Sequence, residues 1–88
     1  MGDTMDNKVL VNLYVSELEK EFEIFLPANK TIGEIIILIS KALYDFSNGY
    51  YNYKNTERIY NKETREKYDL NIILKDSTIR NGSELIFI

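Results

Sequence analysis

Hydrophobic residues in the first third of the sequence recur at every second position, a period that belongs to β-strands with one buried face. In residues 9–15 every odd position is valine or leucine, so these positions are expected to face a core. In residues 19–27, glutamates at every second position alternate with Phe22, Ile24 and Leu26. The short polar stretch between the two segments predicts a turn, and the two strands therefore form a hairpin.

A helical segment follows the hairpin. Thr31 and Glu34 have the spacing of a capping box, in which each residue's side chain binds the backbone N–H of the other. From there to Phe46, apolar residues recur every three or four positions and predict one buried helix face. This face comprises Ile32, Ile35, Ile36, Ile39, Ala42, Leu43 and Phe46. Ile37 and Tyr44 are expected to project from another side of the helix.

The rest of the chain has shorter signals. Residues 47–56 read as a polar loop, and residues 57–61 read as a short strand with one inward isoleucine. Residues 68–74 are ambiguous between a short strand and a turn of helix. A tight turn at residues 80–82 leads into a last strand over residues 84–88.

Two strands, a helix and two further strands thus follow one another in 88 residues. This length supports about one core, and alternating strands indicate a sheet with one covered face. The order predicts an α+β domain of the β-grasp type, with a mixed sheet of four to five strands and one helix packed across one face. We expect a disordered tail over residues 1–7 and a single domain over residues 8–88. The strand order should be 2-1-4-3, with the first and last strands parallel and Val11 beside Phe87.

The sequence contains neither histidine nor cysteine. These side chains supply the commonest general base, a frequent nucleophile and common metal ligands, so we expect no enzymatic activity, metal site or cofactor. The net charge of −3 argues against a nucleic-acid partner, since contact with phosphates needs a basic surface. The longest apolar run, Ile35–Ile39, is far shorter than the ~20 residues that span a bilayer. With no targeting signal at the N-terminus, we expect a cytoplasmic protein without membrane insertion.

Several segments resemble ubiquitin in order and type: Leu26, Thr31–Ile35, Arg58–Tyr60, Leu74, Ile79 and Leu85. The second half more closely resembles the YukD-like proteins, small bacterial ubiquitin-like proteins encoded with type VII secretion systems. Arg58–Glu63 resembles their strand-and-turn segment R-V-V-N-K-D. Leu74–Ile88 resembles their ending L-x-D-x-x-I-x-N-G-D-x-L-x-I-L. The resemblance spans most of the chain, chiefly at positions that specify core and turns.

This resemblance implies a non-conjugating ubiquitin-like accessory or adaptor protein of a bacterial type VII (ESX/WXG100) secretion system, which binds protein components of that machinery. Ubiquitin and the sulfur-carrier proteins end in a flexible Gly-Gly tail that is activated, whereas this sequence ends in its predicted last strand at Phe87-Ile88. The YukD-like proteins also lack the tail. Two alternatives stay open. One is a ubiquitin-like regulatory binding domain unrelated to secretion, and the other is a sulfur-carrier or ubiquitin-type modifier whose Gly-Gly tail is missing from the sequence.

Alternation in the last two strands predicts an apolar patch on the uncovered face of the sheet. Tyr60, Ile86 and Ile88 should point out of this face, and Leu18 lies in the first hairpin turn close to it. In ubiquitin the corresponding positions form the apolar surface that most partners bind, and contiguous exposed apolar area marks interaction sites. These four residues are the candidate partner-binding residues. Scattered exposed residues, or a homodimer contact, would explain the same pattern.

Two other groups of residues allow both a functional and a structural interpretation. The glutamates at positions 17, 19, 21 and 23 could form an acidic binding site, but charges on an edge strand also prevent pairing between molecules. In the loop, Tyr50, Tyr51 and Tyr53 could recognise a partner, or their rings could close the end of the core. We favour the structural interpretation for both groups, and the choice between this loop and the sheet face as binding surface stays open.

Overall fold

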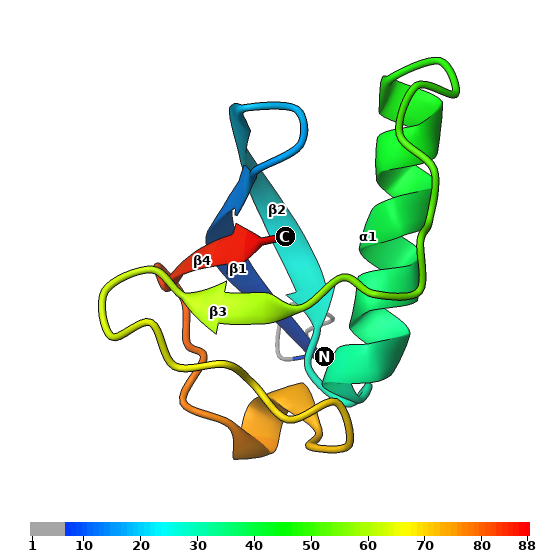
Figure 1. Ribbon diagram of the computed structural model, residues 1–88. Helices are drawn as coiled ribbons and strands as arrows, with labels where there is room; N and C mark the ends of the chain where they lie inside the picture. Colours follow the sequence, from blue (N-terminus) through cyan, green and yellow to red (C-terminus); the bar gives the residue numbers. More distant parts are fainter. Residues whose placement is uncertain (1–6) are drawn as a thin grey trace.

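The computed structural model describes residues 7–88. In chain order its elements are β1 (Lys8–Val15), β2 (Lys20–Pro27), α1 (Ile32–Phe46), β3 (Ile59–Asn61), the 3₁₀ helix η2 (Leu74–Asp76) and β4 (Glu84–Phe87). The helix α1 lies across one face of the sheet (Figure 1). No helix in residues 7–88 is long and apolar enough to cross a membrane. Residues 1–6 of the predicted tail lie outside the described residues, whereas the Asn7 carbonyl accepts a hydrogen bond from the Ala28 N–H.

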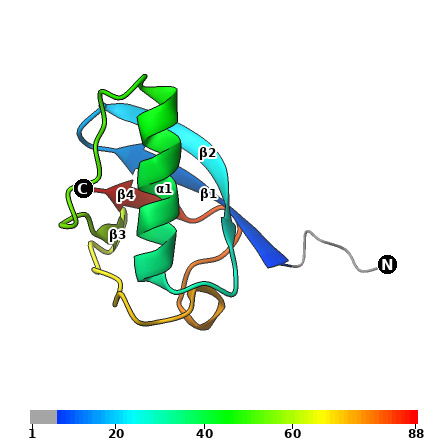
Figure 2. The same ribbon diagram turned by 90° about the vertical axis from the view of Figure 1, so that its right-hand side faces the viewer.

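The strands lie in the order β2-β1-β4-β3. The central pair, β1 and β4, is parallel, and the two outer pairs are antiparallel. When the molecule is turned by 90°, α1 lies in front of the sheet and crosses it (Figure 2). This arrangement confirms the predicted fold, a mixed sheet with one helix on one face, and the predicted strand order.

The register of the central strands differs from the prediction. Phe87 pairs with Val15, so the predicted neighbour Val11 is wrong by four residues. The turn before β4 sets this register, because the Gly82 N–H donates a hydrogen bond to the Leu10 carbonyl. Gly82 adopts a φ of 89°, a conformation that glycine reaches without strain. The chain therefore enters β4 beside the second half of β1.

The start of α1 has the predicted capping box. The Thr31 hydroxyl accepts a hydrogen bond from the Glu34 N–H, and a Glu34 carboxylate oxygen accepts one from the Thr31 N–H. This second bond lowers the pKa of the Glu34 carboxyl. The N–H of Gly33, the second residue of α1, is also paired, because it donates to the Leu70 carbonyl at 2.9 Å. A Cβ at Gly33 would lie only 3.3 Å from that carbonyl oxygen, so a glycine here allows the close approach.

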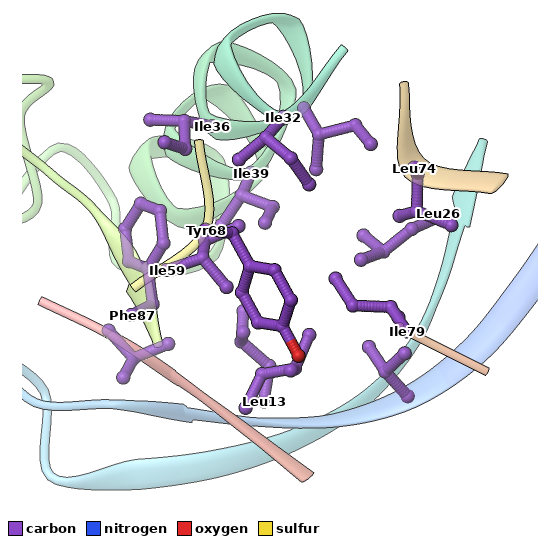
Figure 3. Close-up of a cluster of buried hydrophobic side chains, with 14 of the residues drawn as sticks. Leu13, Leu26, Ile32, Ile36, Ile39, Ile59, Tyr68, Leu74, Ile79 and Phe87 are labelled. Atoms are coloured by element: carbon purple, nitrogen blue, oxygen red, sulfur yellow. The ribbon is translucent and has the colours of Figure 1, made fainter. Parts of the chain in front are cut away.

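The core lies between α1 and the covered face of the sheet (Figure 3). It includes the inward residues of β1 and β4 and five residues of α1, and the irregular stretch between β3 and β4 adds Tyr68, Leu74 and Ile79. The complete cluster is Val11, Leu13, Val15, Leu26, Ile32, Ile35, Ile36, Ile39, Leu43, Tyr51, Ile59, Tyr68, Leu74, Ile79, Leu85 and Phe87. The ambiguous segment over residues 68–74 contains no regular strand or α-helix, and the 3₁₀ helix η2 begins at its last residue.

Two residues of the predicted buried helix face, Ala42 and Phe46, are exposed. Both residues lie near the edge strand β2, where they line a small hollow together with Phe22 and Ile24. There the Phe46 ring packs edge-on against Phe22, with ring centroids 5.1 Å apart. Conversely, Ser40 is buried on the core side, because its hydroxyl donates to the Ile36 carbonyl at 2.8 Å.

The orientation of α1 can be tested with two isoleucines. Ile39 is 4% exposed in the core, whereas Ile37 is 48% exposed on the outer side of the helix. The change Ile39→Ala leaves a cavity and should lower the free energy of unfolding by about 2–5 kcal/mol, whereas Ile37→Ala should cost less than about 1 kcal/mol. Urea denaturation measures both changes, and equal losses would show that α1 buries a different face.

Candidate functional site

One face of the sheet is turned away from α1 (Figure 1) and is here called the open face. It carries the side chains that alternate with the core residues along the strands. The pairing register of the strands places four of these side chains in one row across the sheet. Glu21 of β2 lies beside Tyr14 of β1, Tyr14 lies beside Ile86 of β4, and Ile86 lies beside Tyr60 of β3. An isolated bridge between Tyr60 and Lys67 continues the row beyond β3. The row therefore begins with an acidic residue, passes through large apolar side chains and ends with a basic residue.

Three of the four predicted binding residues meet on this face. Tyr60, Ile86 and Ile88, together with Arg65, line a shallow hollow of about 290 Å³, here called the apolar hollow. Leu18 is not part of it, because it lies in the turn between β1 and β2, half-buried, and packs against the core. The structure thus brings the three sheet residues together and separates Leu18 from them.

Backbone pairing holds the rim of the apolar hollow in place. Ile88 follows β4 and still pairs with Arg58, since each N–H donates to the other's carbonyl at 3.0 and 2.7 Å. Arg65 reaches the hollow through a turn in which its N–H donates to the Asn61 carbonyl, and the Asn61 side chain accepts two further backbone N–H groups. Sequence reasoning missed Arg65, although Asn61 is a residue type that stabilises such turns.

Lysine and glutamate side chains surround the centre of the open face. The Lys62 ammonium lies 3.6 Å from a Glu21 carboxylate oxygen and 4.0 Å from one of Glu84. It also lies 6.0 Å from the centre of the Tyr14 ring. Exposed ion pairs of this kind stabilise a fold by only about 0–1 kcal/mol, so their main effect is to give this face charges of both signs. Tyr14 was absent from the predicted patch, although its even position in the first strand places it on this face.

The acidic residues predicted to protect a sheet edge do lie at one. The strand β2 is outermost in the sheet, and its residues Glu21 and Glu23 are exposed. Glu17 and Glu19 lie in the preceding turn, which separates them from the strand. In residues 7–88, no group of three or more acidic side chains is placed to hold a metal ion.

Of the three tyrosines in the loop over residues 47–56, one has a buried ring and two have exposed rings. Tyr51 is 2% exposed and packs in the core, whereas Tyr50 and Tyr53 are 70% and 45% exposed. The Tyr51 hydroxyl donates to a Glu57 carboxylate oxygen at 2.7 Å, and the Lys54 N–H donates to the same oxygen at 2.9 Å. These contacts of Tyr51, Lys54 and Glu57, here called the loop clamp, attach the loop to the start of β3.

The loop clamp contains a buried carboxylate. Burial alone would raise the pKa of Glu57, but hydrogen bonds from the Tyr51 hydroxyl and from backbone N–H groups outweigh it and lower the pKa. For Tyr51, burial raises the pKa, and the hydrogen bond to the Glu57 carboxylate raises it further. The Lys54 ammonium forms an ion pair with Glu17 and lies 4.3 Å from the centre of the Tyr51 ring. The clamp therefore serves mainly to close the end of the core.

A second apolar surface lies on the outer side of α1. Ile37, Leu38 and Tyr44 are each about half exposed there, at 48%, 46% and 49%. The first and last of these residues project from the side of the helix that the sequence predicted.

No family model matches the sequence, and no curated protein matches it. Solved structures do match the fold. A chain of the MycP5-free ESX-5 inner membrane complex superposes with a TM-score of 0.73 at 14% identity, over 93% of this chain and 21% of that chain. This protein thus spans about a fifth of the ESX-5 chain that it matches.

Two isolated domains match as well. The N-terminal ubiquitin-like domain of the 4931431F19Rik protein has a TM-score of 0.71 at 18% identity, over 93% of this chain and 74% of that chain. The EccD5 ubiquitin-like domain from Mycobacterium xenopi has a TM-score of 0.67 at 12% identity, over 92% of this chain and 94% of that chain. The chain therefore has a ubiquitin-like β-grasp fold.

The loop clamp predicts a loss of stability at both ends of the pH range. The folded pKa of Glu57 lies below its ordinary value of 4.5, so its contribution is present above that pH and disappears as the pH falls through the folded pKa. The folded pKa of Tyr51 lies above its ordinary value of 10, so its contribution is complete below pH 10 and declines as the pH rises. Urea denaturation at a series of pH values measures both declines.

Two tyrosine variants distinguish the stability that comes from the loop clamp from any general effect of changing a tyrosine in this loop. The change Tyr51→Phe leaves the buried Glu57 carboxylate without its hydroxyl donor and should lower the free energy of unfolding at pH 7 by about 1.5–3 kcal/mol. It should also remove the tyrosine contribution to the decline above pH 10. The exposed Tyr53→Phe is the matched control, with an expected change below about 0.5 kcal/mol. Equal stability of the two variants would contradict the role of the clamp.

Proposed function

We propose that this protein is a non-conjugating, YukD-like adaptor of a bacterial type VII secretion system, which acts in the cytoplasm by binding a protein partner through its open face. The observation that carries the proposal is the apolar hollow formed by Tyr60, Ile86 and Ile88 on a ubiquitin-like sheet. Protein-binding surfaces generally have an apolar centre that excludes water and a polar rim. The open face has this composition.

The link to secretion has two supports. The segments Arg58–Glu63 and Leu74–Ile88 resemble the strand, turn and ending of the YukD-like proteins. Independently, the ubiquitin-like fold is shared with a chain of an ESX-5 inner membrane complex and with an EccD5 domain. At 14% and 12% identity these structures support the fold directly, and the role in secretion is our inference.

The hydroxyl groups of the chain favour binding over catalysis. The Ser40 and Ser77 hydroxyls donate to the Ile36 and Leu74 carbonyls and are buried. The Thr78 hydroxyl contacts that of Tyr68 at 3.0 Å. A serine or threonine nucleophile needs an adjacent general base, and the sequence contains no histidine to supply the commonest one. A binding module therefore accounts for the side chains better than an enzyme does.

A second candidate function is a ubiquitin-like regulatory domain that binds a partner outside any secretion system. It is supported by the fold that this chain shares with the 4931431F19Rik ubiquitin-like domain, whose TM-score is within 0.02 of that for the ESX-5 chain. Both candidates use the same open face and differ in the partner. The identity of the captured protein distinguishes them.

The proposal predicts the behaviour of a double variant of the apolar hollow. Tyr60→Asp with Ile86→Asp places two charges in the hollow without changing the core, so the protein should stay folded by circular dichroism. In the host, this variant should no longer co-purify with membrane components of a type VII secretion system and should reduce export of WXG100 substrates at least tenfold. Loss of the apolar centre removes the contacts that carry most of the binding energy.

A matched control carries the same two charges on the other apolar surface. Ile37→Asp with Tyr44→Asp changes the same two residue types at more exposed positions on the outer side of α1. This variant should co-purify and secrete like the unmodified protein. If the control loses binding and the hollow variant keeps it, α1 is the docking surface and the proposal is wrong.

A further inference from the structure

Apart from Glu84 of β4, the acidic and basic residues of the open face have their backbone at opposite edges of the sheet, although the Lys62 side chain reaches past Tyr14 to Glu21 of the same copy. The acidic residues Glu21 and Glu23 belong to β2, at one edge of the sheet. The basic residues Lys62 and Lys67 lie at the opposite edge, one after β3 and the other bridged to Tyr60 of β3. The chain as a whole has a net charge of −3, so this basic edge stands out against an acidic molecule.

The register also fixes how the charges are arranged along the strands. Glu21 stands at the level of Tyr14, Ile86, Tyr60 and Lys67. Glu23 stands one level further along, beside Asn12, which is paired with Glu84. The Lys62 N–H donates to the Glu84 carbonyl, which places Lys62 at that second level. Each of these two levels therefore begins with a glutamate and ends with a lysine. The centre of the first level is apolar, and the centre of the second holds Asn12 and Glu84.

We propose that two copies of this chain associate through their open faces, as an isologous dimer whose two-fold axis runs parallel to the strands, between β1 and β4. The inference rests on the proposed function in so far as it uses the same docking surface, and it names a second copy of the chain as an occupant. An isologous contact requires a self-complementary surface. The charge pattern of the open face satisfies this requirement.

Rotation about that axis reverses the order of the strands across the sheet, so that β1 of one copy lies over β4 of the other. Positions along the strands do not change, so each level of residues faces the same level of the other copy. The edge strand β2 of one copy therefore lies over β3 of the other, so Glu23 faces Lys62, and Glu21 lies over Tyr60 with Lys67 one position further out. At the centre, Tyr14 of one copy lies over Ile86 of the other, beside the apolar hollow. An in-plane axis perpendicular to the strands would instead place β2 on β2 and bring like charges together, which costs free energy.

The size of the face sets the strength of the contact. Four strands about 4.8 Å apart, with side chains repeating about every 6.7 Å, give a face roughly 20 Å by 20 Å. This corresponds to about 400 Å² per copy, half of the roughly 800 Å² that each partner buries in a stable complex. The dimer should therefore be weak and exchange rapidly, with a dissociation constant of roughly 10–1,000 µM. Added salt should weaken it, because its edges are charged.

Charge reversal tests both the occupant and the axis. Sedimentation velocity of the purified full chain from about 10 µM to about 1 mM should show the mass rising toward that of a dimer.

Glu21→Lys with Glu23→Lys makes both edges basic, and Lys62→Glu with Lys67→Glu makes both edges acidic. Each variant alone should associate at least tenfold more weakly than the unmodified chain. Mixed in equal amounts, the two variants should form a heterodimer at least as tight as the original pair, since every edge contact is then between opposite charges.

A control variant has the same change of charge away from the open face. Lys30→Glu with Lys41→Glu alters exposed residues before and within α1 and should associate like the unmodified chain. Near-ultraviolet circular dichroism of the tyrosines checks that each variant is folded. A monomer throughout the concentration range, or a mixture of the two reversed variants that does not associate, would overturn the proposal. A loss of association in the Lys30→Glu, Lys41→Glu control would overturn it too.

The outcome is separable from that of the proposed function. Sedimentation uses only the purified chain and needs no secretion component. If the chain is monomeric but the Tyr60→Asp, Ile86→Asp variant loses its secretion partner, the adaptor function holds and the dimer is refuted. If the reversed variants restore each other's association but the hollow variant secretes normally, the dimer holds and the adaptor function is refuted.

Discussion

The side chains that α1 buries against β1 and β4 form the contact on which the other features of this protein depend. With one 15-residue helix in the described chain, only one face of a four-stranded sheet can be covered. Burial of one face makes each strand alternate, and alternation directs Tyr14, Tyr60 and Ile86 away from the core. The open face is thus a direct result of the way in which a small chain forms a core.

Two small groups of polar contacts hold the start of α1 and the loop that follows the helix. The capping box begins α1 at Thr31, and the loop clamp attaches residues 47–56 to β3 through Glu57. The capping box pairs exposed N–H groups at the helix start, whereas the loop clamp gives hydrogen-bond donors to a buried carboxylate oxygen that would cost about 1–3 kcal/mol if left without a partner. On the open face, strands present Tyr14, Tyr60 and Ile86, whereas Arg65 reaches the apolar hollow from the turn after β3.

Features that depend on neighbouring residues could be predicted from the sequence, whereas those set by distant contacts could not. The capping box and the strand alternation follow from local spacing, and the order of elements then gave the sheet order. The position of Phe87 beside Val15 depends on a turn that binds Leu10, far away in the sequence. The buried pair of Tyr51 and Glu57 and the approach of Arg65 to the hollow likewise need three-dimensional placement. For this reason three of the predicted binding residues meet, while Leu18 does not.

The position of β4 has a consequence for synthesis of the protein. It is the last strand to be made, yet it lies between β1 and β3 at the centre of the sheet. While the ribosome has not yet released β4, the hairpin of β1 and β2 and the short β3 have no common partner, and the edge of β1 that β4 will cover is bare. Such unpaired edges attract other strands. The glutamates along β2 protect only the outer edge, so the inner edge of β1 stays unpaired until β4 has been synthesised and pairs with it.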